Sequence, residues 1–125
     1  MEIVYTDQAP KPGGHYSQAI KSGSLLFISG QLPITPAGQK LTGDIREQVH
    51  QVLDNIIAIT AAAGGDLTSL LKTTVYIADM TYWPIVNEIY QQKFGDHRPA
   101  RAIVPVPELH YGFGVEIEAI AELPG

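Results

Sequence analysis

The sequence predicts a single mixed domain over residues 1–125, in which two amphipathic helices cover one face of a sheet of about six strands. Apolar residues recur at helical spacing in two separate stretches, and shorter stretches around them alternate as strands do. A chain of 125 residues is also the size of one domain that buries roughly two-thirds of its extended surface. The predicted order is three strands, a helix, a strand, a helix and two strands.

The first three strands are expected at residues 2–6, 18–21 and 25–31. Two prolines and two glycines interrupt regular structure in residues 7–14, which we expect to form a loop or flap. The third strand ends at Ser29 and Gly30, where a glycine permits close approach of another group to the backbone. A turn-rich connection follows at residues 33–43.

The first helix is expected to begin at Asp44, which forms a possible capping box with Glu47, and to end at the glycine pair 64–65. Its apolar stripe comprises Ile45, Val49, Val52, Leu53, Ile56, Ile57 and Thr60. The second helix is expected to be capped by Thr81 and to hold Pro84 in its first turn. Its buried stripe comprises Ile85, Val86, Ile89, Tyr90 and Phe94.

Three further strands complete the sheet, at residues 71–79, 99–105 and 115–121. In the first of them, one face carries Leu71, Thr73, Val75 and Ile77. In the last, the apolar row comprises Val115, Ile117, Ala119 and Ala121, and the other face carries Glu116, Glu118 and Glu122. Arg101 alternates with small alanines in the strand before. We therefore expect Arg101 and the glutamates on the same side of the sheet, opposite the core.

The composition favours an oligomer and argues against nucleic-acid binding. Charged residues make up 17% of the chain, below the roughly 25% of an average domain. Two helices leave the second face of the sheet bare, and an exposed apolar patch of that kind usually marks an interface. The net charge is -5 and no basic run exists, so the electrostatic pattern of a nucleic-acid binder is missing.

Several other classes of protein and site are also disfavoured. The chain has no cysteine, which excludes disulfides and thiolate chemistry, and its four histidines lack metal-ligand spacing. The N-terminal residues do not resemble a secretory signal, and no apolar run approaches the ~20 residues that cross a bilayer. We expect a soluble, cytoplasmic protein without a metal site.

Arg101, Glu116 and Glu118 are the first candidates for chemistry. An arginine beside small neighbours can hold a carboxylate or phosphate through two hydrogen bonds, or it can form a structural ion pair with either glutamate. Paired carboxylates can act as acid and base or hold a water, or they can be solvated strand positions. Tyr16 can place a phenol over a site or pack. Ser29 and Gly30 can donate backbone hydrogen bonds to an anion or simply end a strand.

Taken together, several motifs resemble the Rid proteins, the reactive intermediate deaminases that are also labelled YjgF or endoribonuclease L-PSP. The resemblance runs nearly end to end. It rests on Gly14-His-Tyr-Ser-Gln-Ala19, Ser29-Gly-Gln-Leu-Pro33, Lys72-Thr-Thr-Val-Tyr-Ile-Ala-Asp79, Val86-Asn87 with Tyr90, Arg98-Pro-Ala-Arg101 and Val115-Glu-Ile-Glu-Ala-Ile-Ala121.

This resemblance implies a chorismate-mutase-like α+β fold, assembled as a homotrimer with a central barrel and active sites in the clefts between subunits. It also implies 2-iminobutanoate/2-iminopropanoate deaminase activity, the hydrolysis of 2-aminoacrylate-type enamine and imine acids to 2-keto acids and ammonia. Such intermediates are released by pyridoxal-phosphate enzymes, and the deaminase itself needs no cofactor.

The resemblance also implies roles for individual residues. Arg101 would bind the substrate carboxylate, Glu116 would position a water and Tyr16 would complete the catalytic group, while Ser29, Gly30 and Asn87 would shape the cleft. The chain departs from the family pattern at Ile103, where many members have a cysteine, and at His15, where a proline commonly precedes the tyrosine. Ile103 would narrow and dry the substrate pocket, so the departures affect substrate preference more than activity.

Two other functions are compatible with the sequence. The family's second label implies an endoribonuclease or translation inhibitor, against which the acidic balance argues. A non-catalytic module that binds small carboxylates in the same cleft is the other alternative.

Overall fold

The computed structural model describes all 125 residues, and it has the predicted fold of six strands and two helices. The strands are β1 (Glu2–Val4), β2 (Ala19–Ser22), β3 (Leu25–Gln31), β4 (Leu70–Ile77), β5 (Ala100–Pro105) and β6 (Val115–Glu122). The helices are α1 (Ile45–Ala62) and α2 (Trp83–Phe94). Three short 3₁₀ turns are η1 (Leu67–Ser69), η2 (Met80–Tyr82) and η3 (His110–Gly112).

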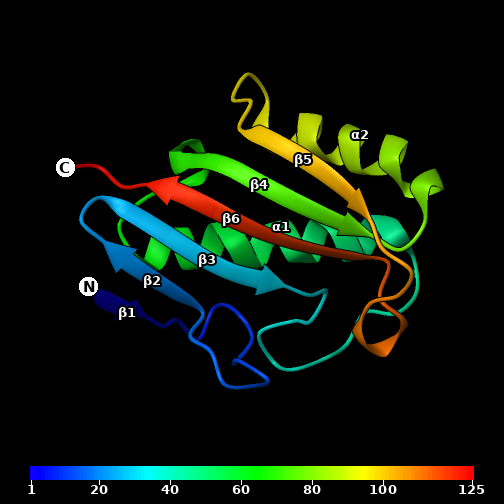
Figure 1. Ribbon diagram of the computed structural model, residues 1–125, viewed down its shortest axis with the longest axis horizontal. Coiled ribbons are helices and arrows are strands. Elements are labelled where there is room, and N and C mark those ends of the chain that lie inside the picture. The colour runs from blue at the N-terminus through cyan, green and yellow to red at the C-terminus, as the bar shows by residue number, and fades with distance from the viewer.

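The sheet has the order β1-β2-β3-β6-β4-β5, and both helices lie on one side of it (Figure 1). Only β4 and β5 are parallel, and α2 makes the crossover between them. The last strand, β6, inserts between β3 and β4 and pairs antiparallel with both. The C-terminal strand therefore holds the two halves of the sheet together. One face of β6 points into the core, and the other belongs to the open face of the sheet.

The core lies between the sheet and the helices and contains 22 buried residues. On α1 the fully buried side chains include Val49, Val52, Leu53 and Ile56, as the periodicity predicted. Ile57 is only half-buried, and Ile59 takes a core position that the predicted stripe omitted. The row Val115, Ile117, Ala119 and Ala121 of β6 faces the same core, which confirms that prediction.

The ends of the helices differ in part from the expectation. Asp44 caps α1 by accepting a hydrogen bond from the Arg46 amide at 2.8 Å, but Glu47 makes no return bond, so the capping box is incomplete. Thr81 was expected to cap α2, and this is wrong. Asp79 caps the preceding turn η2 instead, accepting from both the amide and the hydroxyl of Thr81, and α2 then begins with Pro84 in its first turn.

Leu71 was predicted to share a face with Thr73, Val75 and Ile77, but these three are buried in the structure whereas Leu71 is 44% exposed. A β-bulge between Leu70 and Lys72 inserts one extra residue relative to β6. The alternation therefore shifts by one position, so that Leu70 and Thr73 both point inward. A strand pattern read without its partner cannot reveal such a shift.

The open face of the sheet carries a row of side chains that is apolar except for one lysine. Strand register places one row across all six strands, made of Ile3, Ile20, Phe27, Ile120, Lys72 and Ala100. Ile3 and Phe27 are 65% and 44% exposed, although the burial of large apolar groups is favourable. Neither helix covers this face, and neither is long and apolar enough to cross a membrane.

Candidate active site

Three loops meet at one end of the sheet, as Figure 1 shows: residues 5–18 before β2, residues 32–44 after β3 and residues 106–114 before β6. They meet there because β3 and β6 are antiparallel neighbours, so the end of one lies beside the start of the other. Together they line a pocket of about 240 Å³, whose walls include Tyr16, Gly30, Leu32, Ile34, His110 and Tyr111.

Glu116 lies beside this pocket, at the start of β6 and on the open face. Its carboxylate packs directly over Gly30, so closely that a β-carbon at Gly30 would lie 2.6 Å from a carboxylate oxygen. Burial raises the pKa of Glu116, and the nearby Glu118 adds to this, whereas His110 opposes it. No side chain forms a hydrogen bond with Glu116, and Glu118 instead accepts one from the Tyr76 hydroxyl at 2.8 Å. Of the two glutamates, Glu116 is therefore the one that remains available.

Tyr16 and Ser29 are both engaged in local contacts. The Tyr16 hydroxyl accepts a hydrogen bond from the Gly13 amide at 3.1 Å, which fixes the ring and leaves the phenolic hydrogen free to donate. The Ser29 hydroxyl donates to the Ser17 carbonyl at 2.6 Å, so its proton is used within the chain. Ser29 thus joins β3 to the residue after Tyr16 and shapes the backbone that leads into Gly30.

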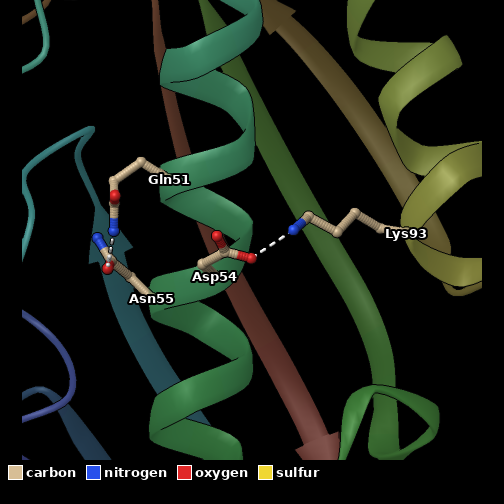
Figure 2. A network of polar contacts seen from close by, with 4 residues as sticks. All are labelled: Gln51, Asp54, Asn55 and Lys93. Carbon is tan, nitrogen blue, oxygen red and sulfur yellow. Dashed lines mark hydrogen bonds and ion pairs between the residues drawn. The ribbon is translucent and has the colours of Figure 1, made fainter.

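Three buried amide side chains hold the pocket loops, and sequence reasoning missed all of them. Gln18 bonds Thr6 and Pro10, Gln48 bonds Gly43 and Gly114, and Asn55 donates to the carbonyls of Leu32 and Ile34. In Figure 2, Asn55 extends from α1 and accepts from Gln51 at 2.8 Å. The signal that could have revealed two of them is the occurrence of amides at positions 48 and 55, within the buried face of α1.

Arg101 lies elsewhere, at the start of β5 and on the helix side. It donates to the Asn87 amide oxygen at 3.2 Å, and its guanidinium lies 4.9 Å from the centre of the Tyr90 ring. Burial raises the pKa of Tyr90 to about 12, and its hydroxyl donates to Thr73 at 3.0 Å, which holds the ring in place. These residues border a second pocket of about 520 Å³.

No acidic side chain pairs with Arg101. The only ion pairs in the chain are Arg46 with Glu88, at 2.8 Å, and Lys93 with Asp54, which joins the two helices in Figure 2. The structural alternative for Arg101, an ion pair with Glu116 or Glu118, is therefore wrong for the single chain. The guanidinium is held by a neutral amide and a ring, and its charge has no partner.

The expectation that Arg101 and Glu116 share one side of the sheet is also wrong. Strand β4 lies between β5, which carries Arg101, and β6, which carries Glu116. The buried Thr73 of β4 pairs with Arg101 on β5 and with Ala119 on β6. Paired residues point to the same side, so Arg101 faces the helices. Glu116 is level with Tyr76 and faces away from the helices, three residues or about 10 Å nearer the start of β6 than Ala119.

The predicted site residues thus form two groups within one chain. Glu116, Gly30 and Tyr16 constitute the acidic half-site, and Arg101, Asn87 and Tyr90 constitute the arginine half-site. Ile103 is level with Val75, on the same side as Arg101, and packs against the core. No group of three or more histidine, aspartate and glutamate side chains is arranged to hold a metal ion.

Comparisons with known proteins agree on one family. The sequence model described as endoribonuclease L-PSP matches residues 6–123. A RutC family protein of Pyrococcus horikoshii is 50% identical, over 96% of each chain. The chloroplastic Reactive Intermediate Deaminase A of Arabidopsis thaliana is 42% identical, over 98% of this chain and 66% of that protein.

Among solved structures, Escherichia coli TdcF with bound serine has a TM-score of 0.94 at 37% identity, and the match covers 99% of this chain and all of that one. The family model spans nearly the whole sequence, the Pyrococcus relative matches it over 96% of each chain, and TdcF has the same fold. The chain therefore belongs to the endoribonuclease L-PSP family, which is also known as the Rid or YjgF family.

Proposed function

We propose that this protein is a 2-iminobutanoate/2-iminopropanoate deaminase that hydrolyses 2-aminoacrylate-type enamine and imine acids to 2-keto acids and ammonia. The observation that carries the proposal is the unpaired Arg101. A guanidinium held by Asn87 and Tyr90, with no carboxylate of its own chain, is prepared to bind a small carboxylate through two hydrogen bonds. The reactive intermediate deaminase of Arabidopsis and the serine-bound TdcF support a small amino-acid-like substrate.

The proposal requires a second copy of the chain. Arg101 and Glu116 lie on opposite sides of one sheet, so they can reach a single small molecule only if they come from different subunits. The exposed apolar row on the open face supports a homotrimer, in which the sheets would pack against one another and bury Phe27 and its neighbours. Each cleft would then join the arginine half-site of one subunit to the acidic half-site of the next.

The chemistry needs only the chain's own side chains. Arg101 holds the substrate carboxylate and thereby fixes the imine carbon beside Glu116. Glu116 accepts a proton from the water as the water oxygen adds to the imine carbon, and it then passes this proton to the imine nitrogen, which gives a carbinolamine. Glu116 next transfers the carbinolamine hydroxyl proton to the nitrogen, so that the carbon–nitrogen bond breaks and ammonia and the 2-keto acid are released. The raised pKa of Glu116 makes the ionised carboxylate a stronger base for this water.

A coupled assay tests the activity directly. A dehydratase supplies 2-iminopropanoate, and pyruvate release is measured with and without the protein. We expect acceleration over the rate in buffer, and the Arg101→Ala variant should lose about ten- to a hundredfold in kcat/KM, because bonds to charged groups contribute about 1.5–3 kcal/mol. Arg46→Ala, which removes a surface arginine paired with Glu88, is the control. Wild-type rates no faster than buffer would refute the proposal.

A mixing experiment tests the shared site. Arg101→Ala and Glu116→Gln proteins should each be strongly impaired alone, but mixed trimers would pair an intact arginine half-site with an intact acidic half-site. After denaturation and joint refolding of equal amounts, about a quarter of the clefts in cyclic trimers should be intact, with a matching return of activity. If activity does not return although mixed oligomers form, the site is not shared between subunits.

The family label implies RNA cleavage as an alternative function. It is tested with the same wild-type and Arg101→Ala proteins. A phosphodiester substrate favours a basic surface, whereas this chain has a net charge of -5. RNA cleavage that survives stringent purification and disappears in Arg101→Ala would favour the nuclease over the deaminase.

A further inference from the structure

Tyr111 is the only residue other than glycine with a positive φ, at 56°, in the turn η3. Bulky side chains rarely adopt this left-handed conformation, because the β-carbon crowds the backbone. Gly112, which also has a positive φ of 73°, follows directly. The strained conformation is thus placed on a tyrosine although a glycine, which adopts it without strain, lies next to it.

The Tyr111 ring is supported on several sides. Its centre lies 5.6 Å from that of the buried Phe113 ring, in an edge-to-face arrangement. The Lys40 ammonium, from the loop after β3, lies 4.7 Å above it, and the His110 ring is 5.9 Å away. Despite these contacts the side chain is 62% exposed. Burial therefore does not account for the strain, and a strained residue without such an account points to function.

Tyr111 lines the pocket of the acidic half-site. The lining of the same pocket also includes the aromatic ring of Tyr16 and the aliphatic side chains of Leu32 and Ile34, beside the polar groups of Lys11, Gln18 and Gln31. Gly30, over which the Glu116 carboxylate packs, belongs to this pocket too. Its volume of about 240 Å³ is below the roughly 300–1,000 Å³ of pockets for drug-sized ligands. The pocket is therefore large enough for a single substrate side chain, such as a benzyl or isobutyl group, next to Glu116.

We infer that Tyr111 is a specificity-determining residue, whose ring forms the wall that receives the substrate side chain and favours aromatic or large aliphatic imino acids over 2-iminopropanoate. This inference rests on the proposed function. If Arg101 of one subunit holds the carboxylate and Glu116 of the next faces the imine carbon, the substituent on that carbon points toward Tyr16 and Tyr111. A methyl group would leave this wall uncontacted, whereas a benzyl or isobutyl group would pack on it.

The test compares two substrates in one variant. An amino-acid oxidase generates the imino acids of phenylalanine and alanine, and keto-acid formation is followed for wild type and Tyr111→Gly. The substitution removes the ring and also relieves the positive φ, so the variant should fold at least as well as wild type. We expect kcat/KM for the phenylalanine-derived imine to fall at least about tenfold, with less than about threefold change for the alanine-derived imine.

Trp83→Ala, which removes an exposed aromatic ring on α2 outside this pocket, is the matched control and should change neither value. Equal losses on both substrates in Tyr111→Gly, or no loss on either, would overturn the inference.

If the proposed function is wrong, the wild-type protein will accelerate hydrolysis of neither the phenylalanine-derived nor the alanine-derived imine, which distinguishes this outcome from a failure of the inference alone. In that case calorimetry with phenylpyruvate and pyruvate decides. Tighter binding of phenylpyruvate that disappears in Tyr111→Gly would uphold the assignment of the pocket, and absence of that preference in wild type would reject it.

Discussion

The position of the Glu116 carboxylate depends on the absence of a side chain at Gly30. A β-carbon there would lie 2.6 Å from the carboxylate oxygen, closer than such contacts occur. We predict that Gly30→Ala displaces the carboxylate and lowers kcat by about a hundredfold, the loss that a misplacement of about 1 Å can cause. Circular dichroism should show an unchanged fold. Gly43→Ala is the control, because no atom lies within 4 Å of a β-carbon built at Gly43. A Gly30→Ala enzyme with normal rates would mean that Glu116 needs no fixed position.

Glu116 should also reduce the stability of the folded chain at neutral pH. Burial raises its folded pKa above the unfolded value, so the folded state binds more protons between the two values and stability falls as the pH rises through them. We predict that Glu116→Gln is more stable than wild type in urea at pH 7. The difference should vanish below about pH 4, where the carboxyl is protonated in both states. Both proteins are compared at one concentration, and equal midpoints at pH 7 would contradict this account.

At the level of elements, Asn55 connects helix α1 to the loop that lines the pocket. Its amide group is buried and donates to the carbonyls of Leu32 and Ile34. We predict that Asn55→Ala lowers the unfolding free energy by about 1–3 kcal/mol, since it leaves buried acceptors without donors. It should also raise KM, because Leu32 and Ile34 belong to the pocket wall.

The neighbouring Gln51 provides the control for this prediction. Gln51 donates to the Asn55 side chain, as Figure 2 shows, but it makes no bond to the loop. Gln51→Ala should therefore leave KM unchanged. If both variants behave alike, the bonds between Asn55 and the loop do not hold the pocket.

The helices and most strands could be predicted from the sequence because their side-chain periodicity records which face each element buries. The apolar row of β6 and the stripe of α1 were found in this way. The face of Arg101 could not be found, because alternation relates residues within a strand and does not say how one strand is aligned with the next. That information lies in the register through β4, where Thr73 is buried and level with Arg101. The bulge at Leu70 is of the same kind, since it depends on the partner strand.

The candidate site was predicted in its parts but not in its arrangement. The association of Arg101 with Asn87 and of Glu116 with Gly30 agrees with the residues proposed from the family resemblance. Gln18, Gln48 and Asn55 were missed because the apolar pattern that identifies a buried face does not include polar amides. Tyr111 was missed because a backbone dihedral leaves little signal in a tyrosine followed by glycine.

At the level of the whole molecule, the open face of the sheet and the two half-sites lead to the same assembly. The row from Ile3 to Ile120 leaves apolar side chains exposed in the single chain, with Phe27 near its middle. Packing copies of this face together would bury that row and allow half-sites from different chains to meet. One assembly thus accounts for an exposed apolar surface and for an arginine that has no acidic partner.

Phe27→Glu should therefore separate the subunits and remove the activity together. A carboxylate in the middle of this row would have to lose its water on assembly, and the one cation in the row, Lys72, lies two strands away, so the change is unfavourable. We predict a single-chain mass of about 13.6 kDa by light scattering, against a multiple of that mass for wild type, with the secondary structure retained because the Phe27 side chain is 44% exposed in the lone chain. Ala61→Glu adds the same charge at an exposed position of α1, on the side of the sheet that the helices cover, and should change neither mass nor activity. A Phe27→Glu protein that is monomeric and fully active would show that one chain completes the site. An assembly that withstands the charge would show that the subunits meet through another surface.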